Sequence, residues 1–350
     1  MNEIGYLLES GTNRIGALDF QASAKKYIPR AHKNASLEEL LTSVERIEKG
    51  ILLTSELDSA LHHGSSIGGV RPKALIDDSD RKYIAKFSSN SDEYSVVKSE
   101  YIAMRLATLS GIKAAPVSIK SVSGKDVLLI ERFDRIKTDR GYARRSLISA
   151  LTLFALDEMM ARYASYQDFC EIIRNEFEEP KKNLKELWKR LVFNILVGNN
   201  YDHARNHAAF WDGKNLSLTP AYDLCPQKRG SRESNQAMLI YRDDKRSRLE
   251  TCFQASQQFL LSRKNAIKIT EEIIESIIKH WSNMMEEGQV SPVDERIMKT
   301  TQFLNPYAFE DLAPDATSLV LLKKDFNHKL KLFRNFFKIE SVCQTDLIFS

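Results

Sequence analysis

Cysteine is scarce in this sequence, and long apolar segments are absent. The four cysteines, Cys170, Cys225, Cys252 and Cys343, form no C-x-x-C pair. This argues against zinc ribbons and thioredoxin chemistry, and it fits a reducing compartment. No window approaches the roughly 20 apolar residues that a membrane span needs, and the N-terminus has neither the basic region nor the apolar core of a signal peptide. We therefore expect a cytoplasmic protein with no membrane partner.

Neither sign of charge dominates. The 350 residues carry a formal net charge of +4, and 43% of them are hydrophobic and 28% charged. This composition is ordinary for a globular chain, and the excess of positive charge is too small to indicate nucleic-acid binding by itself. The length is sufficient for two lobes, at least one of which has a large core.

Several common site motifs are also missing. The stretch "SSIGGVRPK" at 65–73 lacks the Walker spacing, which disfavours a P-loop NTPase. His203 and His207 lie four residues apart, but zinc would need a further ligand and no H-E-x-x-H is present. Neither internal repeats nor low-complexity segments occur.

The order of patterns along the chain predicts an α+β lobe followed by an all-α lobe, with the boundary near residue 135. Residues 1–35 read as irregular, after which Ser36 and Glu39 form a capping box that opens a helix ending at Gly50. Short strand-like runs and one helix occupy 64–135. The chief helices expected beyond residue 143 span 184–199, 265–281 and 318–337.

Two features of the smaller lobe suggest phosphate chemistry. Gly68 and Gly69 allow the backbone to approach an anion, although such a pair is also typical of a plain hairpin turn. Lys86 alternates with apolar residues in "YIAKF". It is either a solvated lysine on an edge strand or a lysine that holds nucleotide phosphates, with Glu100 of the next helix as its partner.

The polar cluster in "GNNYDHARNHAAF…LTPAYDLCP" is the most informative. Asn206 and Asp223 carry oxygen atoms suited to Mg²⁺, and the residues between them predict a β-hairpin around "DGKN". This order of loop, hairpin and aspartate is typical of metal-binding kinase lobes. The run "LLIERFDR" at 128–135 is either a hinge that meets an adenine or simply the end of a strand.

Taken together, "SSIGGVRPKAL", "YIAKF", "LIERFDR", "DHARNHAAF" and "LTPAYDLCP" resemble the HipA family of bacterial serine/threonine protein kinases, the toxins of toxin–antitoxin pairs. The resemblance implies a two-lobed, protein-kinase-like fold that uses ATP and Mg²⁺. It also indicates a short, HipT-like form, with 1–50 as a remnant of the N-terminal subdomain plus a helix, 51–135 as the N-lobe and 136–350 as the C-lobe.

The resemblance further assigns roles to individual residues. The phosphate-covering loop would include Gly68, Gly69, Val70 and Lys73, and Lys86 would hold the phosphates. Glu131 and Phe133 would meet the adenine through their backbone, with Asp134 near the ribose. Asn206 and Asp223 would bind Mg²⁺, beside the catalytic-loop residues Tyr201, Asp202 and His203. Ser66, or its neighbour Ser65, would be autophosphorylated, and this would switch the enzyme off because the added negative charge lies where ATP phosphates must sit.

The chain departs from the family pattern at the catalytic base. The family places an aspartate five residues before the metal-binding asparagine, and Tyr201 stands there, while Asp202 is only four residues before Asn206. Either Asp202 acts after a local shift, or the base is absent and the protein binds ATP without efficient turnover. A kinase that modifies small molecules or lipids is a third hypothesis, which no residue favours.

The family also implies partners. A protein substrate is expected, and an aminoacyl-tRNA synthetase is the first candidate. The antitoxin of such kinases is a small helix-turn-helix protein, so that any contact with DNA would be indirect. The part of the N-terminal subdomain that this chain lacks would be a separate small protein.

Overall fold

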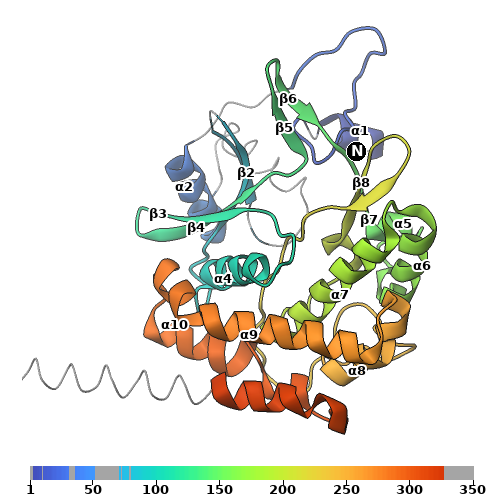
Figure 1. Cartoon of the computed structure of the whole chain (residues 1–350). Coiled ribbons are helices and arrows are strands. Elements are labelled where there is room, and N and C mark those ends of the chain that lie inside the picture. Colours follow the sequence, from blue (N-terminus) through green and yellow to red (C-terminus); the bar gives the residue numbers. More distant parts are fainter. Residues whose placement is uncertain are drawn as a thin grey trace, which may run out of the picture.

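The computed structural model describes residues 3–9, 11–30, 36–51, 71, 73–78 and 80–326. These residues form a smaller part built on an antiparallel sheet and a larger, mostly helical part (Figure 1). The elements of the smaller part are α1 (Glu3–Glu9), α2 (Leu37–Glu48), β1 (Lys73–Asp77), β2 (Lys82–Phe87), α4 (Val96–Leu109), β3 (Val117–Val122) and β4 (Lys125–Glu131).

The sheet of the smaller part has the strand order β1-β2-β4-β3, with antiparallel neighbours. Its two faces bury different partners because side chains alternate along each strand. Ala85 and Phe87 of β2 pack with α2, whereas Ile84 lies against the core on the other face, where α4 contacts β3 and β4. Lys86, two residues from Ile84, therefore points toward α4.

The helix α2 begins as the sequence predicts. Ser36 caps it in the β region, its side chain accepts a hydrogen bond from the backbone of Glu39, and the Glu39 side chain accepts one in return. This capping box satisfies two N–H groups that would otherwise lack partners. Gly50 follows the helix with a φ of 68°, a conformation that suits glycine.

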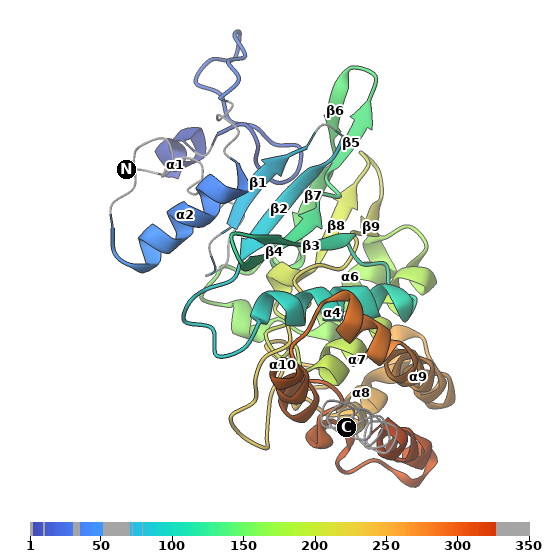
Figure 2. The same ribbon diagram turned by 90° about the vertical axis from the view of Figure 1, so that its left-hand side faces the viewer.

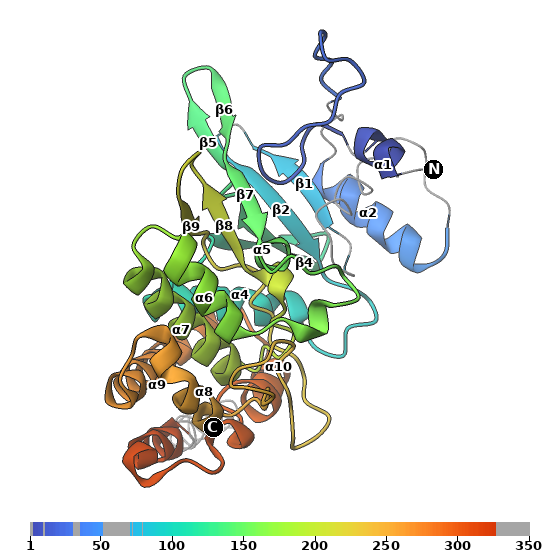
Figure 3. The same cartoon turned by 90° about the vertical axis from the view of Figure 1, so that its right-hand side faces the viewer.

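The larger part contains one three-stranded sheet, β7-β8-β9, beneath the β5–β6 hairpin, with helices packed around it (Figure 3). Its elements are β5 (Arg135–Thr138), β6 (Gly141–Arg144), β7 (Ser146–Ser149), α5 (Ala150–Leu153), η1 (Ala161–Tyr163), α6 (Tyr166–Glu176), α7 (Pro180–Val197), η2 (Ala204–Asn206), β8 (Ala208–Trp211), β9 (Leu216–Leu218), α8 (Leu249–Ala255), η3 (Ser256–Phe259), α9 (Arg263–Glu287), α10 (Pro292–Ile297), η4 (Met298–Gln302), η5 (Pro306–Phe309) and η6 (Pro314–Ala316).

One hydrophobic core joins the two parts. It includes Ile102 and Leu106 of α4, Trp188 of α7 and Trp281 of α9, all almost fully buried. Figure 2 shows α4 between the four-stranded sheet and the helices of the larger part. Burial of this much apolar surface is the main force that holds the sheet above the helices. No helix within the described ranges is long and apolar enough to cross a membrane.

Two expectations about the elements need correction. Residues 3–9 are helical rather than irregular. The larger part is not all-α, since β7 joins the predicted hairpin β8–β9 and β5 pairs with β6. These strands have three or four residues each, which is too short for a periodic pattern to identify. Of the predicted 318–337 helix, residues 318–326 are helical, and the remainder lies outside the described residues.

Candidate active site

Lys86 lies at the centre of a buried cluster of charges. Its Nζ is 2.5 Å from Glu100 Oε1 on α4 and 2.5 Å from Asp223 Oδ1, which follows β9. The side chains of Lys86 and Glu100 are only 8% and 3% exposed, whereas that of Asp223 is 36% exposed. The expected partner Glu100 is therefore paired with Lys86, and Asp223 is the member of the cluster that faces the outside.

The neighbouring carboxylates keep Lys86 positively charged. Burial alone would lower the pKa of Lys86, but the carboxylates of Asp223 and Glu100 raise it above its ordinary value. The pKa of Asp223 is lowered, chiefly by the charge of Lys86. Lys73 lies opposite Lys86 across the β1–β2 pair, and burial, followed by repulsion from Lys86, lowers the pKa of Lys73. Two lysines and two carboxylates therefore lie close together beneath the sheet.

Asp223 and Asn206 carry oxygen atoms of the kind that magnesium prefers. Asp223 has a φ of 59°, a left-handed conformation that costs energy for a residue other than glycine and is often found at functional sites. Asn206, 7% exposed, uses its amide nitrogen to bond the carbonyl of Tyr201 at 3.1 Å, which leaves its side-chain oxygen for another partner. Magnesium is typically held by one or two protein oxygens together with nucleotide phosphates and water.

The catalytic loop begins at a glycine that no other residue could replace without strain. Gly198 ends α7 with a φ of 74°, and a Cβ atom built there would lie 2.8 Å from the carbonyl oxygen of Gln302. Its own carbonyl accepts a hydrogen bond from the backbone of Gln227 at 3.0 Å. Asn199 then bonds Asn194 Oδ1 at 3.0 Å and the Asp223 carbonyl at 3.4 Å. The loop is thus joined to both α7 and Asp223.

The side chains of the neighbours Tyr201 and Asp202 lie in different environments. The Tyr201 side chain is 58% exposed and stacks edge-on against His203, with 4.8 Å between ring centres. Asp202 is 2% exposed, and its carboxylate accepts hydrogen bonds from the Tyr166 hydroxyl and from His207 Nε2, the latter at 3.0 Å. Asp202 would therefore have to leave these two partners before its carboxylate could meet a substrate hydroxyl, so its role as the base stays a prediction that requires a local shift.

The segment that joins the two parts contains Glu131 and Phe133, the residues expected to meet an adenine through their backbone. The amide of Glu131 donates to the Pro116 carbonyl at 2.9 Å, and its side chain pairs with Arg81. Of the backbone groups of Glu131, only the carbonyl therefore remains to bond an adenine. Phe133 packs against Phe210 and Tyr222, with ring centres 5.8 and 5.6 Å apart.

Asp134 does not lie free beside a ribose position. It is 2% exposed and receives hydrogen bonds from Arg132, Arg135 and the backbone of Gly16, the last at 2.7 Å. Burial would raise the pKa of Asp134, but the two guanidinium groups hold it below its ordinary value. The position of Asp134 near a ribose stays a prediction, and in this conformation its carboxylate is engaged by these three groups. The carboxylate of Asp134 fastens the N-terminal segment to the joint between the two parts.

With this geometry described, the chain can be compared with known proteins. The family model described as the HipA-like C-terminal domain matches residues 65–281, more than half of the chain. The chain belongs to this family. Its Lys86–Glu100–Asp223 cluster, Asn206 and the catalytic loop all fall inside the matched HipA-like region.

Curated relatives give the same family. A Sinorhizobium fredii protein named as a kinase, Y4mE, is 28% identical over 146 residues, which is 40% of this chain and 33% of the relative. The serine/threonine-protein kinase toxin HipA of Shewanella oneidensis is 25% identical over 183 residues, which is 45% of this chain and 42% of that protein. The chain therefore spans only about a third to two fifths of each relative's length.

The fold is that of the HipA kinases. A solved structure titled as the HipA, HipB and operator DNA complex of the toxin–antitoxin system of Shewanella oneidensis matches with a TM-score of 0.67 at 19% identity. The match covers 93% of this chain and 77% of the other chain. The expected two-lobed, protein-kinase-like architecture is thereby confirmed, with the sheet as N-lobe and the helical part as C-lobe.

Part of the HipA-like site lies outside the described residues. Ser65, Ser66, Gly68, Gly69 and Val70 of the expected phosphate-covering loop all fall there. Just beyond them, Arg71 forms a bidentate pair with Asp92 at 2.9 and 2.6 Å, which fixes the end of the loop next to α4.

Several contacts at the site could not be anticipated from the sequence. They are the Arg71–Asp92 pair, the clamp around Asp134 and the Tyr166–Asp202–His207 cluster. The Arg71–Asp92, Gly16–Asp134 and Tyr166–Asp202 contacts join residues that are distant in the chain, and none of the contacts has a characteristic spacing. The tyrosine before Asp202 was the only signal that the catalytic loop is unusual.

Proposed function

We propose that this chain is an ATP- and Mg²⁺-dependent serine/threonine protein kinase, the toxin of a bacterial toxin–antitoxin pair. The observation that carries the proposal is the buried Lys86, which joins Glu100 to Asp223. A buried lysine held protonated between two carboxylates is well suited to receive phosphate oxygens. The HipA-like family and the kinase fold support the same reaction class.

In this proposal each residue has a defined task. Lys86, aligned by Glu100, binds the phosphates from the sheet, and Lys73 adds positive charge beside it. Asp223 and Asn206 hold Mg²⁺, which neutralises charge on the phosphates when bound. Phe133, Phe210 and Tyr222 provide an apolar surface near the joint for the base. The loop that bears Gly68 and Gly69 covers the phosphates, and autophosphorylation at Ser66 or Ser65 turns the enzyme off.

The substrate and partners follow from the family. We propose a cytosolic protein as substrate and would test an aminoacyl-tRNA synthetase first. The Shewanella structure contains the HipB protein and operator DNA, which supports a helix-turn-helix antitoxin as partner and contact with DNA only through it. A small separate protein that replaces part of the N-terminal subdomain is proposed for the HipT-like form.

A second candidate is a protein that binds ATP and its antitoxin but transfers phosphate poorly. Tyr201 favours it, because the exposed side chain at the position of the base is a phenol and the adjacent carboxylate of Asp202 is enclosed. Catalysis of phosphoryl transfer depends mainly on positioning and electrostatics, so the loss of a base lowers turnover without removing nucleotide binding.

Intact-mass spectrometry decides between these two candidates. The purified protein and a Tyr201→Asp variant are weighed before and after incubation with ATP and Mg²⁺. Phosphate on the unchanged chain supports the active kinase. Phosphate on Tyr201→Asp alone supports the impaired form with an otherwise complete site. If neither variant gains phosphate and neither binds ATP in a thermal-shift assay, the proposed nucleotide site is wrong.

A further inference from the structure

A single buried glutamine connects two segments of the candidate active site. Gln302 ends the π-helical turn η4 and is fully buried. Its side-chain oxygen accepts a hydrogen bond from the Ser99 hydroxyl on α4 at 2.9 Å, and its side-chain nitrogen donates to the Pro226 carbonyl at 3.3 Å. Ser99 immediately precedes Glu100, and Pro226 follows Asp223 by three residues. One amide therefore connects the neighbour of one acid to the segment that bears the other.

The backbone of Gln302 also lies against the catalytic loop. Its carbonyl oxygen would be 2.8 Å from a Cβ atom built on Gly198. Two residues beyond Gln302, the Leu304 amide donates to the Leu196 carbonyl of α7 at 2.6 Å. On the other side, the Gln227 amide donates to the Gly198 carbonyl at 3.0 Å. The start of the loop is thus held between the end of η4 and the segment that follows β9.

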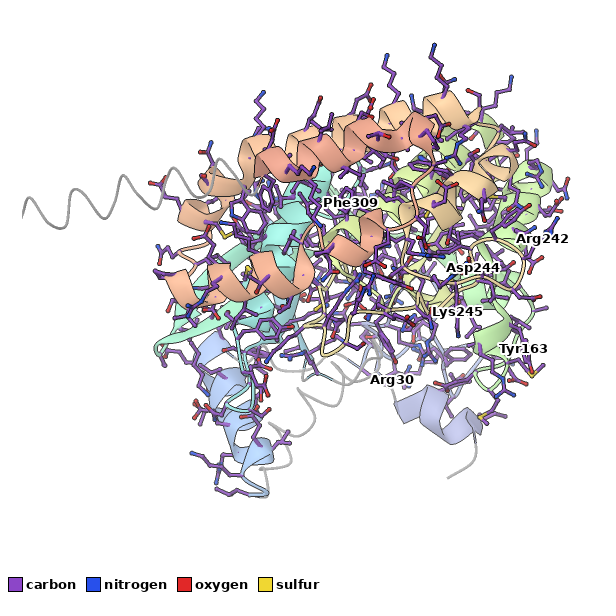
Figure 4. All side chains as sticks on the ribbon, turned by 90° about the horizontal axis from the view of Figure 1, so that it is seen from below. Arg30, Tyr163, Arg242, Asp244, Lys245 and Phe309 are labelled. Carbon is purple, nitrogen blue, oxygen red and sulfur yellow. The ribbon has the colours of Figure 1, made fainter. Side chains whose placement is uncertain are left out.

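The turn that carries Gln302 is anchored in the hydrophobic core. Met298 at its start and Phe303 just after its end are buried, and Phe303 packs edge-on against Trp281 of α9, with 5.0 Å between ring centres. Farther along, Phe309 lies among the helices of the larger lobe (Figure 4). Turns of the π-helical type are rare and are frequently found at functional sites. A side chain on so firmly packed a turn can fix the position of its hydrogen-bond partners.

The two hydrogen bonds of Gln302 determine which way its amide faces. A carbonyl can only accept a hydrogen bond, so the amide nitrogen faces Pro226 and the amide oxygen faces Ser99. The Tyr94 hydroxyl donates to the same Pro226 carbonyl at 3.3 Å. Gln302→Glu keeps the size of the side chain and its acceptor for Ser99, but it turns a carboxylate oxygen toward a buried carbonyl, a contact that is unfavourable.

We propose that Gln302 is a positioning residue, which holds Asp223 at a fixed spacing from Glu100. At this spacing both acids reach Lys86. Under the proposed kinase function, the same spacing determines how Asp223 meets Mg²⁺ while Lys86 meets the phosphates. The consequence for Mg²⁺ rests on that function, whereas the order of the segment 223–227 does not.

Alkylation of Cys225 tests the proposal without any nucleotide. Cys225 is partly buried and immediately precedes Pro226, whereas Cys170 and Cys252 are fully buried. We expect Gln302→Glu to raise the rate at which iodoacetamide alkylates Cys225 about tenfold, because the segment opens more often. Mass spectrometry of tryptic peptides gives the rate at each cysteine. An unchanged rate at Cys225, or an equal rise at all three cysteines, would overturn the proposal.

The matched control is Asn183→Asp in α7. The buried Asn183 amide also bonds two backbone groups, since its nitrogen donates to the Glu178 carbonyl at 2.6 Å and its oxygen accepts from the Leu218 amide at 3.0 Å. The substitution makes the same chemical change about 20 Å along α7 from the catalytic loop. We expect a loss of stability similar to that of Gln302→Glu, with alkylation of Cys225 unchanged. An equal rise at Cys225 in both variants would show that the effect is not specific to Gln302.

The coupling between Mg²⁺ and ATP tests the consequence for the active site. The dissociation constant of an ATP analogue that cannot be hydrolysed is measured by calorimetry with and without Mg²⁺. We expect Mg²⁺ to strengthen binding about tenfold less in Gln302→Glu than in the unchanged chain. Ser99→Ala, which keeps the bond to Pro226, should show a smaller change in the same direction.

A loss of folded protein would weaken binding equally with and without Mg²⁺, so the ratio of the two constants separates positioning from stability. An unchanged ratio in both Gln302→Glu and Ser99→Ala would contradict the positioning of Asp223. If the unchanged chain binds no nucleotide, the proposed function is wrong, and the alkylation of Cys225 alone decides the role of Gln302.

Discussion

Lys86 shows how one side chain can serve both stability and function. It is buried with Glu100 and Asp223 within 2.5 Å, and removal of one member of a buried ion pair leaves an uncompensated charge. Without Lys86, the uncompensated buried charge would be chiefly that of Glu100, because Asp223 can turn toward solvent.

We therefore predict that Lys86→Met lowers the free energy of unfolding by about 3 kcal/mol at neutral pH. The double variant Lys86→Met/Glu100→Met should recover most of this loss, because no buried charge remains. Urea denaturation measures both effects. Equal destabilisation of the single and double variants would show that the pair adds no electrostatic coupling. Nucleotide binding should be lost in both variants.

Asp202 and its neighbour Tyr201 should contribute very differently to stability, because one side chain is buried and the other is exposed. Burial alone would raise the pKa of Asp202, but the interaction with His207 and the Tyr166 hydroxyl lowers it below its ordinary value. A carboxylate whose pKa is lower in the folded state stabilises the protein fully above the unfolded pKa of about 3.9. That contribution is lost as the pH falls through the folded pKa.

Asp202→Asn should therefore reduce stability by about 1–3 kcal/mol at pH 7 and flatten the fall in stability between about pH 5 and 2. Tyr201→Phe, at an exposed side chain, is the control and should leave stability unchanged. Urea denaturation at a series of pH values gives both curves. An unchanged acid limb in Asp202→Asn would mean that the enclosed carboxylate is not linked to folding.

At the scale of elements, the turn from α7 into the catalytic loop depends on Gly198. Its positive φ and the Gln302 carbonyl 2.8 Å from a built Cβ act together against any side chain. Gly50 ends α2 with a φ of 68° and has nothing within 4 Å of such a Cβ. Both glycines have a positive φ, and only at Gly198 would an added Cβ atom meet a neighbouring backbone group.

Gly50→Ala should thus cost about 1 kcal/mol through backbone conformation alone. Gly198→Ala should cost at least about 2 kcal/mol more, because the backbone of either segment must move. It should also lower the affinity for ATP and Mg²⁺, since Asn206 and Asp223 depend on the loop. Thermal unfolding and nucleotide titration of both variants test this, and equal destabilisation would contradict a contact at Gln302.

Elements with a long periodic pattern were predictable, and short ones were not. The capping box of Ser36, helices α4, α7 and α9, and the strands around Lys86 follow from local patterns. The β5–β6 hairpin and β7 did not, because strands of four residues are too short for a periodic pattern, and β7 in addition pairs with β8, which lies far along the chain. In the candidate site, residue type and order predicted the pairing of Lys86 with Glu100, and the roles of Asn206 and Asp223 at a metal stay predictions. The burial of Asp202 and Asp134 could not be identified, since only tertiary neighbours determine it.

At the scale of the whole molecule, the N-terminal segment joins the two lobes. Arg132 and Arg135 bond backbone carbonyls of Asn13, Arg14 and Gly16, while Asp134 receives the Gly16 amide. This clamp lies where the chain passes from β4 into β5.

Asp134→Asn should loosen the clamp, because two buried guanidinium groups lose their anion. We predict faster amide hydrogen exchange over residues 11–30, with little change in α7 or α9. Asp19→Asn is a useful comparison, since Asp19 pairs with Arg30 at the partly buried edge of the same segment, and it should have a smaller effect. Unchanged exchange at residues 11–30 in Asp134→Asn would indicate that other contacts hold the segment.

The helix α4 bears Glu100 and is bonded to both lobes. Ser99 donates to Gln302, Lys98 to the Gln289 carbonyl, and Arg105 to Glu287, at 2.9, 2.6 and 2.8 Å. On its other side α4 packs against β3 and β4, and Lys98 also pairs with Asp126 of β4. A movement of the sheet relative to the larger lobe would therefore strain the contacts of α4 together with those of Lys86. The ion triad would register such a movement through Glu100 and Asp223 together.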